Sequence, residues 1–329
     1  MNNDEVCQPS AKELESAYDF IGSWLDPTPV LESKPLNDLI GCRVLLKAEG
    51  LQRTGSFKYR GALWRLSQLE SHQRKRGVVT FSSGNFALGL AAAGRELDIP
   101  VTVVMPDDAP ISKIDAVKES GASICLTSHG RQSREAVASA RANEIATEQD
   151  LLLVHPFDDP HVVAGQASMM LELLDQLEGV VIDYVLVPVG GGGLIAGAGN
   201  ALSYRGVDTR LIGVEPVGYD SMGQSLIENE RLTIKTRGST LCDALMAPCP
   251  GAVTYEAARR FVDTVLVVDD GLVRQAMLRA FEYFRVVQEP SGSVSLAALD
   301  MCEFNGDETV VVVGSGGNIS FERFISLVT

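Results

Sequence analysis

Apolar runs of strand length alternate with longer stretches of helical period along most of the chain. Each run holds four or five residues and is rich in valine, isoleucine and leucine. The runs are 44–47, 78–81, 101–105, 123–126, 151–154, 185–189, 211–214, 265–268 and 310–313. This alternation predicts an α/β protein with mostly parallel, twisted sheets, because helices then serve as the crossovers between neighbouring strands.

The runs fall into two groups, which predicts two domains. Four of them lie close together in the chain, enough for a small separate sheet, and the rest supply a larger one. We expect a small domain over residues 77–154 and a large domain made of residues 1–76 and 155–329. A capping box that begins at Ser10 predicts the first helix, and the Asp-Pro-Thr-Pro sequence at 26–29 predicts its end.

The charge balance narrows the partners that the chain can have. It carries 43 acidic and 28 basic residues, a formal net charge of −15, with no block of basic residues interleaved with aromatics. Nucleic acid and anionic membranes are therefore not expected as partners. The N-terminal segment does not resemble a signal peptide, and no apolar stretch is long enough to span a membrane, so a cytoplasmic location is expected. The six cysteines lack the spacing of a zinc site or a disulfide framework.

Lys58 stands where a glycine-containing turn enters a helical stretch, in the sequence TGSFKYRGA at 54–62. The helix dipole disfavours a charged lysine at this end of a helix. Its pKa is therefore lowered toward the neutral amine that carbonyl chemistry needs. A solvated surface lysine is the alternative, since most lysines are exposed.

Two further segments place backbone N–H groups at a helix start. Ser82-Ser83-Gly84-Asn85 follows the run 78–81 and suits a substrate carboxylate, although a plain helix cap would have the same composition. The glycines at 190–193, followed by Leu194, suit a phosphate group. Residues 191–196 also satisfy GxGxxA, with Glu215 at the end of the next strand, which keeps a dinucleotide as a rival ligand.

The last run leads into Gly314-Ser315-Gly316-Gly317-Asn318, another hydroxyl at the end of a strand. Together, these four motifs resemble those of fold type II pyridoxal-phosphate (PLP) enzymes, and within them the serine/threonine dehydratase and serine racemase family. The likeness runs from about Pro27 to Asn318 and includes HPFDDP at 155–160 and EPSG at 289–292. The order and spacing of four motifs are more specific than any single one. The resemblance implies a tryptophan-synthase-β-like fold, a homodimer and PLP as the cofactor.

The resemblance also assigns roles to individual residues. Lys58 would form the Schiff base and remove the Cα proton, and Ser83 matches a serine that relatives use on the opposite face of the cofactor. Asn85 would bond the ring hydroxyl and Ser315 would face the pyridine nitrogen. The implied cofactor-binding residues are Phe57, Lys58, Asn85, Gly190, Gly191, Gly192, Gly193, Leu194, Glu289 and Ser315. The implied substrate-binding residues are Ser82, Ser83, Gly84, Asn85 and Arg134.

By resemblance, the expected reaction is dehydration of a small L-β-hydroxy amino acid to a 2-keto acid and ammonia. Threonine, serine and 3-hydroxyaspartate are the candidate substrates, the last because Arg134 matches a position that meets a second carboxylate in relatives. Ser83 leaves amino-acid racemisation open. Phe86 stands where relatives often carry histidine. A non-catalytic ligand sensor and a dinucleotide-binding oxidoreductase are the alternatives of a different class.

The resemblance further suggests a divalent cation such as Mg²⁺. Relatives hold it with a glutamate after a strand and an aspartate a few residues on, and Glu215 with Asp220 approximate this pair. Asp220 stands one position early, with Ser221 in the expected place. Solvated surface acids are the alternative interpretation of both residues.

Overall fold

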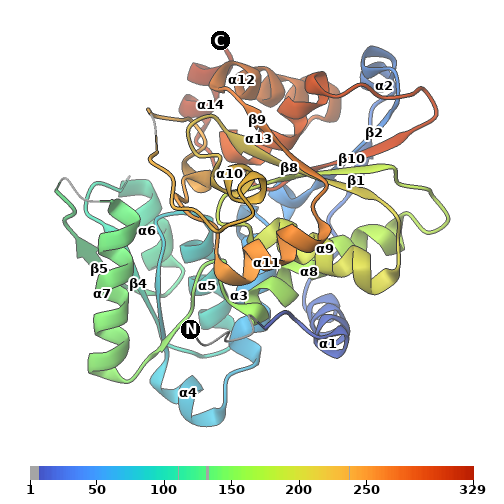
Figure 1. Cartoon of the computed structure of the whole chain (residues 1–329). Helices are drawn as coiled ribbons and strands as arrows, with labels where there is room; N and C mark the ends of the chain where they lie inside the picture. The colour runs from blue at the N-terminus through green and yellow to red at the C-terminus, as the bar shows by residue number, and fades with distance from the viewer. Residues whose placement is uncertain (1–6, 110, 131–132, 237) are drawn as a thin grey trace.

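The computed structural model describes residues 7–109, 111–130, 133–236 and 238–329 and contains two sheets (Figure 1). The larger sheet has the strand order β1-β2-β10-β7-β8-β9, and the smaller has the order β5-β4-β3-β6. The larger sheet comprises β1 (Val30–Glu32), β2 (Arg43–Ala48), β7 (Tyr184–Pro188), β8 (Arg210–Pro216), β9 (Thr264–Val268) and β10 (Thr309–Gly314). The smaller comprises β3 (Val78–Phe81), β4 (Val101–Pro106), β5 (Ser123–Thr127) and β6 (Leu152–Leu153).

Helices connect and cover these strands. In the first part of the chain they are α1 (Ala11–Gly22), α2 (Lys34–Ile40), α3 (Lys58–Ser67), α4 (Ser71–Arg76), α5 (Asn85–Glu96), α6 (Ile111–Glu119) and α7 (Arg134–Gln149). After β6 follow α8 (Pro160–Gln176), α9 (Gly193–Arg205), α10 (Ser221–Ile227), α11 (Ala252–Phe261), α12 (Asp270–Arg279), α13 (Pro290–Ala297) and α14 (Phe321–Val328). Among the described residues, no helix is both long and apolar enough for a membrane crossing.

The central strands of the larger sheet are mostly apolar because both of their faces are buried. Along β10, Val311 and Val313 join a core with α1, α3, α8 and α9. The alternate residues Val310 and Val312 join a second core with α2, α12, α13 and α14. This period of two, with helices on both sides, explains the continuous valine run and confirms the predicted α/β class with mostly parallel sheets.

The two sheets share one hydrophobic core. Val78, Val101 and Val103 of the smaller sheet belong to the same cluster as α3, α8 and α9 of the larger unit, with α5 between them. Helix α7 covers the opposite face of the smaller sheet, on the outer flank of the molecule (Figure 1). The chain leaves the larger unit after α3 and returns to it at α8, and α5 of the smaller unit packs against α3.

The sequence pattern missed one strand and misplaced one helix end. Strand β1 has only three residues and pairs antiparallel with β2 at the edge of the sheet, so it is too short to show a period. Helix α1 begins as predicted, with the Ser10 hydroxyl accepting from the Glu13 N–H at 3.2 Å, but it ends at Gly22, before the predicted stop at 26–29.

Candidate active site

Lys58 is the first residue of α3, and its side chain is half-buried between aromatic rings. The ammonium nitrogen lies 4.9 Å from the centre of the Phe57 ring and 5.8 Å from that of Phe86. It donates one hydrogen bond, of 3.3 Å, to the carbonyl of Pro156. Burial lowers the pKa of Lys58 to about 8, which makes the neutral amine accessible near neutral pH.

The turn before Lys58 is tied to the last strand motif. Thr54 and Gly55 both adopt left-handed backbone conformations, with φ of 63° and 75°. Ser56 then forms an isolated antiparallel bridge with Gly316, and the Phe57 N–H donates to the Ser315 carbonyl at 3.2 Å. Ser315, predicted for the cofactor ring, therefore lies directly beside the Lys58 segment although 257 positions separate the two in sequence.

A glycine on α5 brings the Ser82–Asn85 loop next to Lys58. A Cβ atom at Gly89 would lie 3.2 Å from the Tyr59 nitrogen and 3.3 Å from the Lys58 carbonyl carbon, so α5 and α3 pack backbone to backbone. The predicted loop follows β3 and ends at Asn85, the first residue of α5. Ser83 is half-buried in this loop, and the Gly84 N–H donates to the Ser82 hydroxyl at 3.3 Å.

Asn85 and Glu289 meet in a buried chain of hydrogen bonds that also includes Asn318. The Asn85 amide donates to the Glu289 carboxylate at 2.5 Å and accepts from the Asn318 amide at 2.9 Å. Asn318 also donates to the Thr54 carbonyl at 2.8 Å, so it joins the Lys58 turn to α5. Burial, followed by the repulsion of Asp243, raises the pKa of Glu289 to about 7, against the opposing effects of the Asn85 hydrogen bond and of Lys113.

The four glycines form a tight turn from β7 into α9. Gly192 has φ of +94° and Gly193 begins the helix, so the first N–H groups of α9 have no partner within it. A Cβ atom at Gly191 would lie 2.4 Å from ring atoms of Phe157. Because Lys58 bonds the neighbouring Pro156, residues 156–157 lie between the amine and the glycine turn.

Two residues beside this turn pack close to the site but were given no role from the sequence. His155 and Phe157 stack edge to face at 4.6 Å, and the His155 Nδ1 accepts from the Asp158 N–H at 2.9 Å. Burial lowers the pKa of His155, and the nearby Lys58 lowers it further. The HPFDDP sequence at 155–160 contributed to the family resemblance, but nothing in it indicated that Phe157 packs against Gly191.

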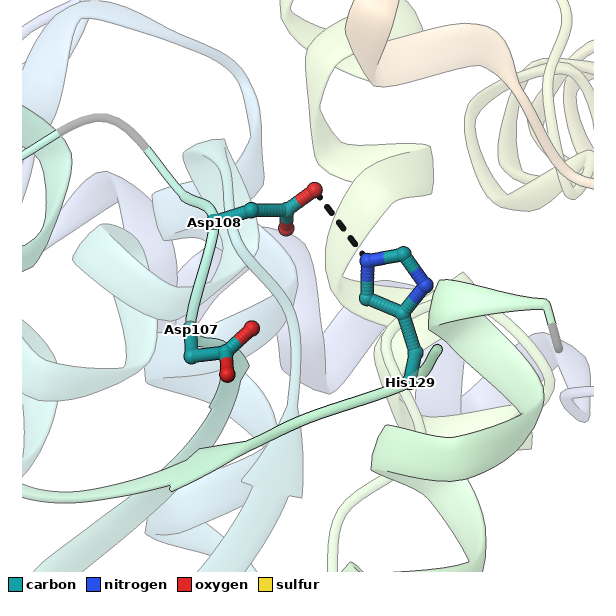
Figure 2. A group of neighbouring side chains, drawn as sticks. All are labelled: Asp107, Asp108 and His129. Carbon is teal, nitrogen blue, oxygen red and sulfur yellow. Dashed lines mark hydrogen bonds and ion pairs between the residues drawn. The ribbon is translucent and has the colours of Figure 1, made fainter. Parts of the chain in front are cut away.

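Arg134 is the first residue of α7, beside the smaller sheet, and lies in a cluster with Asp107, Asp108 and His129. Its guanidinium pairs with the Asp108 carboxylate at 3.0 Å and is 43% exposed. The His129 Nε2 lies 3.1 Å from the same carboxylate, and Figure 2 shows His129 and Asp108 pointing toward each other from separate loops. The predicted anion-binding arginine therefore already has a carboxylate partner.

Glu215 and Asp220 do not form the expected cation cage. Both oxygens of the buried Glu215 carboxylate accept backbone N–H groups, from Met222 at 2.9 Å and from Gly223 at 2.8 Å. The Asp220 carboxylate accepts instead from Gln224 at 2.9 Å. Through these two hydrogen bonds Glu215 serves as an internal cap for α10. Burial raises the pKa of Glu215 to about 8. The arrangement does not fit a resident cation.

The remaining geometry fits PLP. A desolvated lysine amine suits the aldehyde, an anion-binding helix start suits the phosphate, and a strand-end serine and an asparagine suit the ring. The glycines are required by close packing: a Cβ atom at Gly190 would lie 3.0 Å from the Leu245 Cα, and one at Gly316 would lie 2.2 Å from the Glu289 carboxylate oxygen. The site thus defines a PLP-dependent enzyme.

Comparison with known proteins leads to the same class. Residues 23–316 match the family described as "Pyridoxal-phosphate dependent enzyme". The L-threonine ammonia-lyase of Thermotoga maritima is 37% identical over 309 residues, which cover 94% of this chain and 75% of that protein. The L-threo-3-hydroxyaspartate ammonia-lyase of Saccharomyces cerevisiae is 34% identical over 322 residues, which cover 98% of this chain and 97% of that protein. Maize serine racemase superposes with a TM-score of 0.90 at 32% identity, covering 97% of each chain. The chain therefore belongs to the PLP-dependent fold type II family of serine/threonine dehydratases and serine racemases.

Proposed function

We propose that this enzyme is an ammonia-lyase that converts a small L-β-hydroxy amino acid, threonine or serine, to a 2-keto acid and ammonia. The observation that carries the proposal is the position of Lys58. Its amine is desolvated, has a pKa near 8, and lies beside the Ser82–Asn85 loop because α3 and α5 meet at Gly89. A base of this pKa is suited to remove a Cα proton near neutral pH.

When bound, PLP supplies the electron-withdrawing ring that stabilises negative charge at the substrate Cα. The N–H groups at the start of α9 would hold its phosphate, and Lys58 would bond its aldehyde. Ser315 would meet the ring nitrogen with a neutral hydroxyl, which does not favour a protonated ring as a carboxylate does. This choice favours prompt loss of the β-hydroxyl over a long-lived charge at Cα.

The Ser82–Asn85 loop would bind the substrate carboxylate through its hydroxyls and backbone N–H groups. Phe57, Phe86 and Phe157 surround the amine and its neighbours with apolar surface, which excludes water from the proton that Lys58 moves. Phe86 offers no polar group to the substrate side chain, which suits the methyl of threonine better than a charged group.

We rank 3-hydroxyaspartate after threonine and serine. A second carboxylate would have to separate Arg134 from Asp108, and the lost ion pair opposes its binding. Racemisation is the second candidate, because the half-buried Ser83 lies in the loop beside Lys58 and its hydroxyl could return a proton to Cα. The proposal includes no divalent cation.

A direct test gives purified enzyme L-threonine, L-serine or L-threo-3-hydroxyaspartate and measures the keto acid, with chiral chromatography for the D-amino acid. We expect keto acid from threonine or serine at least about tenfold faster than from hydroxyaspartate. Racemisation should fall in Ser83→Ala more than elimination does. Equal keto acid from all three substrates would contradict the ranking, and D-amino acid without keto acid would favour the racemase.

A further inference from the structure

A basic pocket lies at the amino edge of the smaller sheet, away from the Ser82–Asn85 loop. It is formed where β4 begins, by the last turns of α4 and α5 and by Gly121 before β5, and has a volume of about 480 Å³. Arg74, Lys75 and Arg95 line it together with Asp98. Helix α5 runs from Asn85 at the active site to Arg95 at this pocket.

The charge of the lining is opposite to that of the protein. Three cationic side chains and one acidic side chain give a formal excess of two positive charges in a chain of net charge −15. Within the described parts of the chain, no carboxylate lies within ion-pair distance of Arg74, Lys75 or Arg95. Arg76, one position further along α4, is by contrast paired with Asp150.

Each of the two arginines donates one side-chain hydrogen bond to a backbone carbonyl, which leaves most of its donors free. Arg74 donates to the Leu97 carbonyl at 3.5 Å, and Arg95 donates to the Glu119 carbonyl at 3.2 Å. Each guanidinium has five N–H donors, so four remain on each.

We propose that this pocket binds a phosphate monoester of a small metabolite. Two guanidinium groups and a lysine match the two charges and three oxygens of a phosphoryl group. The volume lies within the range of roughly 300–1,000 Å³ of small-molecule sites, more than free phosphate needs, and Ile99 and Val101 give an apolar wall for the organic part. The site is separate from the PLP phosphate site at α9 and does not depend on the reaction proposed above.

The test is equilibrium dialysis of the PLP-saturated enzyme against radiolabelled glycerol 3-phosphate and, in a second arm, labelled inorganic phosphate. Bound PLP blocks the glycine turn, so the label reports the new pocket. We expect one ester bound per protomer, more tightly than inorganic phosphate. Its affinity should fall about tenfold or more in Arg95→Gln or Arg74→Gln.

Arg76→Gln is the matched control, because it removes the same charge from the same helix but outside the pocket. The affinity of Arg76→Gln for glycerol 3-phosphate should stay within about twofold of the wild-type value. The visible absorbance of bound PLP verifies that every variant is folded. Tighter binding of inorganic phosphate than of the ester would contradict the ester assignment. The proposed site would be ruled out if the wild type bound no stoichiometric amount of the ester. It would also be ruled out if Arg76→Gln lost as much affinity for the ester as the arginine variants of the pocket.

Discussion

A half-buried amine and a buried carboxyl group at the active site both have pKa values shifted toward 7. Burial lowers the pKa of Lys58 to about 8 and raises that of Glu289 to about 7. Both groups can therefore change protonation near neutral pH, the range in which proton transfer by a side chain is most effective. Asn85, on the helix that packs against the Lys58 segment, holds the Glu289 carboxylate.

The raised pKa of Glu289 predicts a pH-dependent cost to stability. Its folded pKa of about 7 exceeds the ordinary value of 4.5, so the folded chain binds the proton more tightly than the unfolded chain. The contribution of Glu289 to stability therefore falls as pH rises from about 4.5 to 7, by up to a few kcal/mol. Glu289→Gln should unfold at a higher temperature relative to wild type at pH 8 than at pH 5. A difference that is the same at both pH values would contradict this cause.

Gly191→Ala should weaken PLP binding, because its Cβ would lie 2.4 Å from the Phe157 ring and push the glycine turn away from that ring. We expect at least about tenfold faster loss of PLP on dialysis, corresponding to roughly 1.4 kcal/mol. Gly22→Ala is the control, since a Cβ there meets open space. Retention of PLP by Gly191→Ala as in wild type would show that the turn tolerates the added carbon.

At the scale of elements, α3 is fixed by a buried ionic cluster two residues after Lys58. Arg60 is fully buried and pairs with Glu49 at 2.8 Å and with Glu172 of α8 at 2.9 Å. Lys47 of β2 pairs with the same Glu172 at 2.5 Å. The cluster joins β2, α3 and α8, and thereby sets where the first turn of α3 presents its lysine.

Removal of Arg60 should leave two buried carboxylates undercompensated. Arg60→Met is expected to lower the free energy of unfolding by about 3–5 kcal/mol, as for other broken buried pairs. Arg43→Met, which breaks the exposed pair with Glu32, should cost about 1 kcal/mol or less. Urea denaturation of the wild type, Arg60→Met and Arg43→Met measures the free energy of unfolding of each. Equal losses of stability in the two variants would mean that the buried cluster does not hold α3.

Sequence patterning located the strands and the chain-local parts of the site well. All nine predicted strands form. In the central strands of the larger sheet, burial on both faces leaves a continuous apolar run, whereas Ser123 and Leu126 of β5 are exposed. The helix starts at Lys58, Asn85 and Gly193 follow from local signals. Contacts between distant segments have no local signal, so the packing of Phe157 on Gly191 went unassigned. The role of Glu215 depends on the N–H groups of α10 that meet it, which no residue pattern shows.

At the scale of the whole molecule, the parts of the chain that form the two sheets are joined by a shared core and by an ion pair. Lys113 of α6 pairs with Asp243, whose neighbour Leu245 packs on Gly190. Both charges also act on Glu289: Asp243 raises its pKa and Lys113 lowers it. The ion pair between Lys113 and Asp243 therefore acts on the proton affinity of Glu289.

This arrangement predicts opposite shifts from two substitutions. Lys113→Gln should move the Glu289-dependent midpoint of the pH–activity profile upward, and Asp243→Asn should move it downward. Each shift should be a few tenths of a pH unit to about one, because the pair is partly exposed. Measurement of kcat/KM from pH 5 to 9 gives the midpoint for each variant. Shifts of both midpoints in the same direction would exclude a simple charge effect.

The central claim is that Lys58 carries PLP, and the absorbance spectrum of the purified protein tests it most directly. Wild-type enzyme should show a band near the visible edge that changes on addition of L-threonine or L-serine, with keto acid formed. Lys58→Ala should lack that band and lose at least about 10³-fold in activity. A colourless wild-type protein that PLP does not reconstitute, or a Lys58→Ala variant with an unchanged band, would contradict the account.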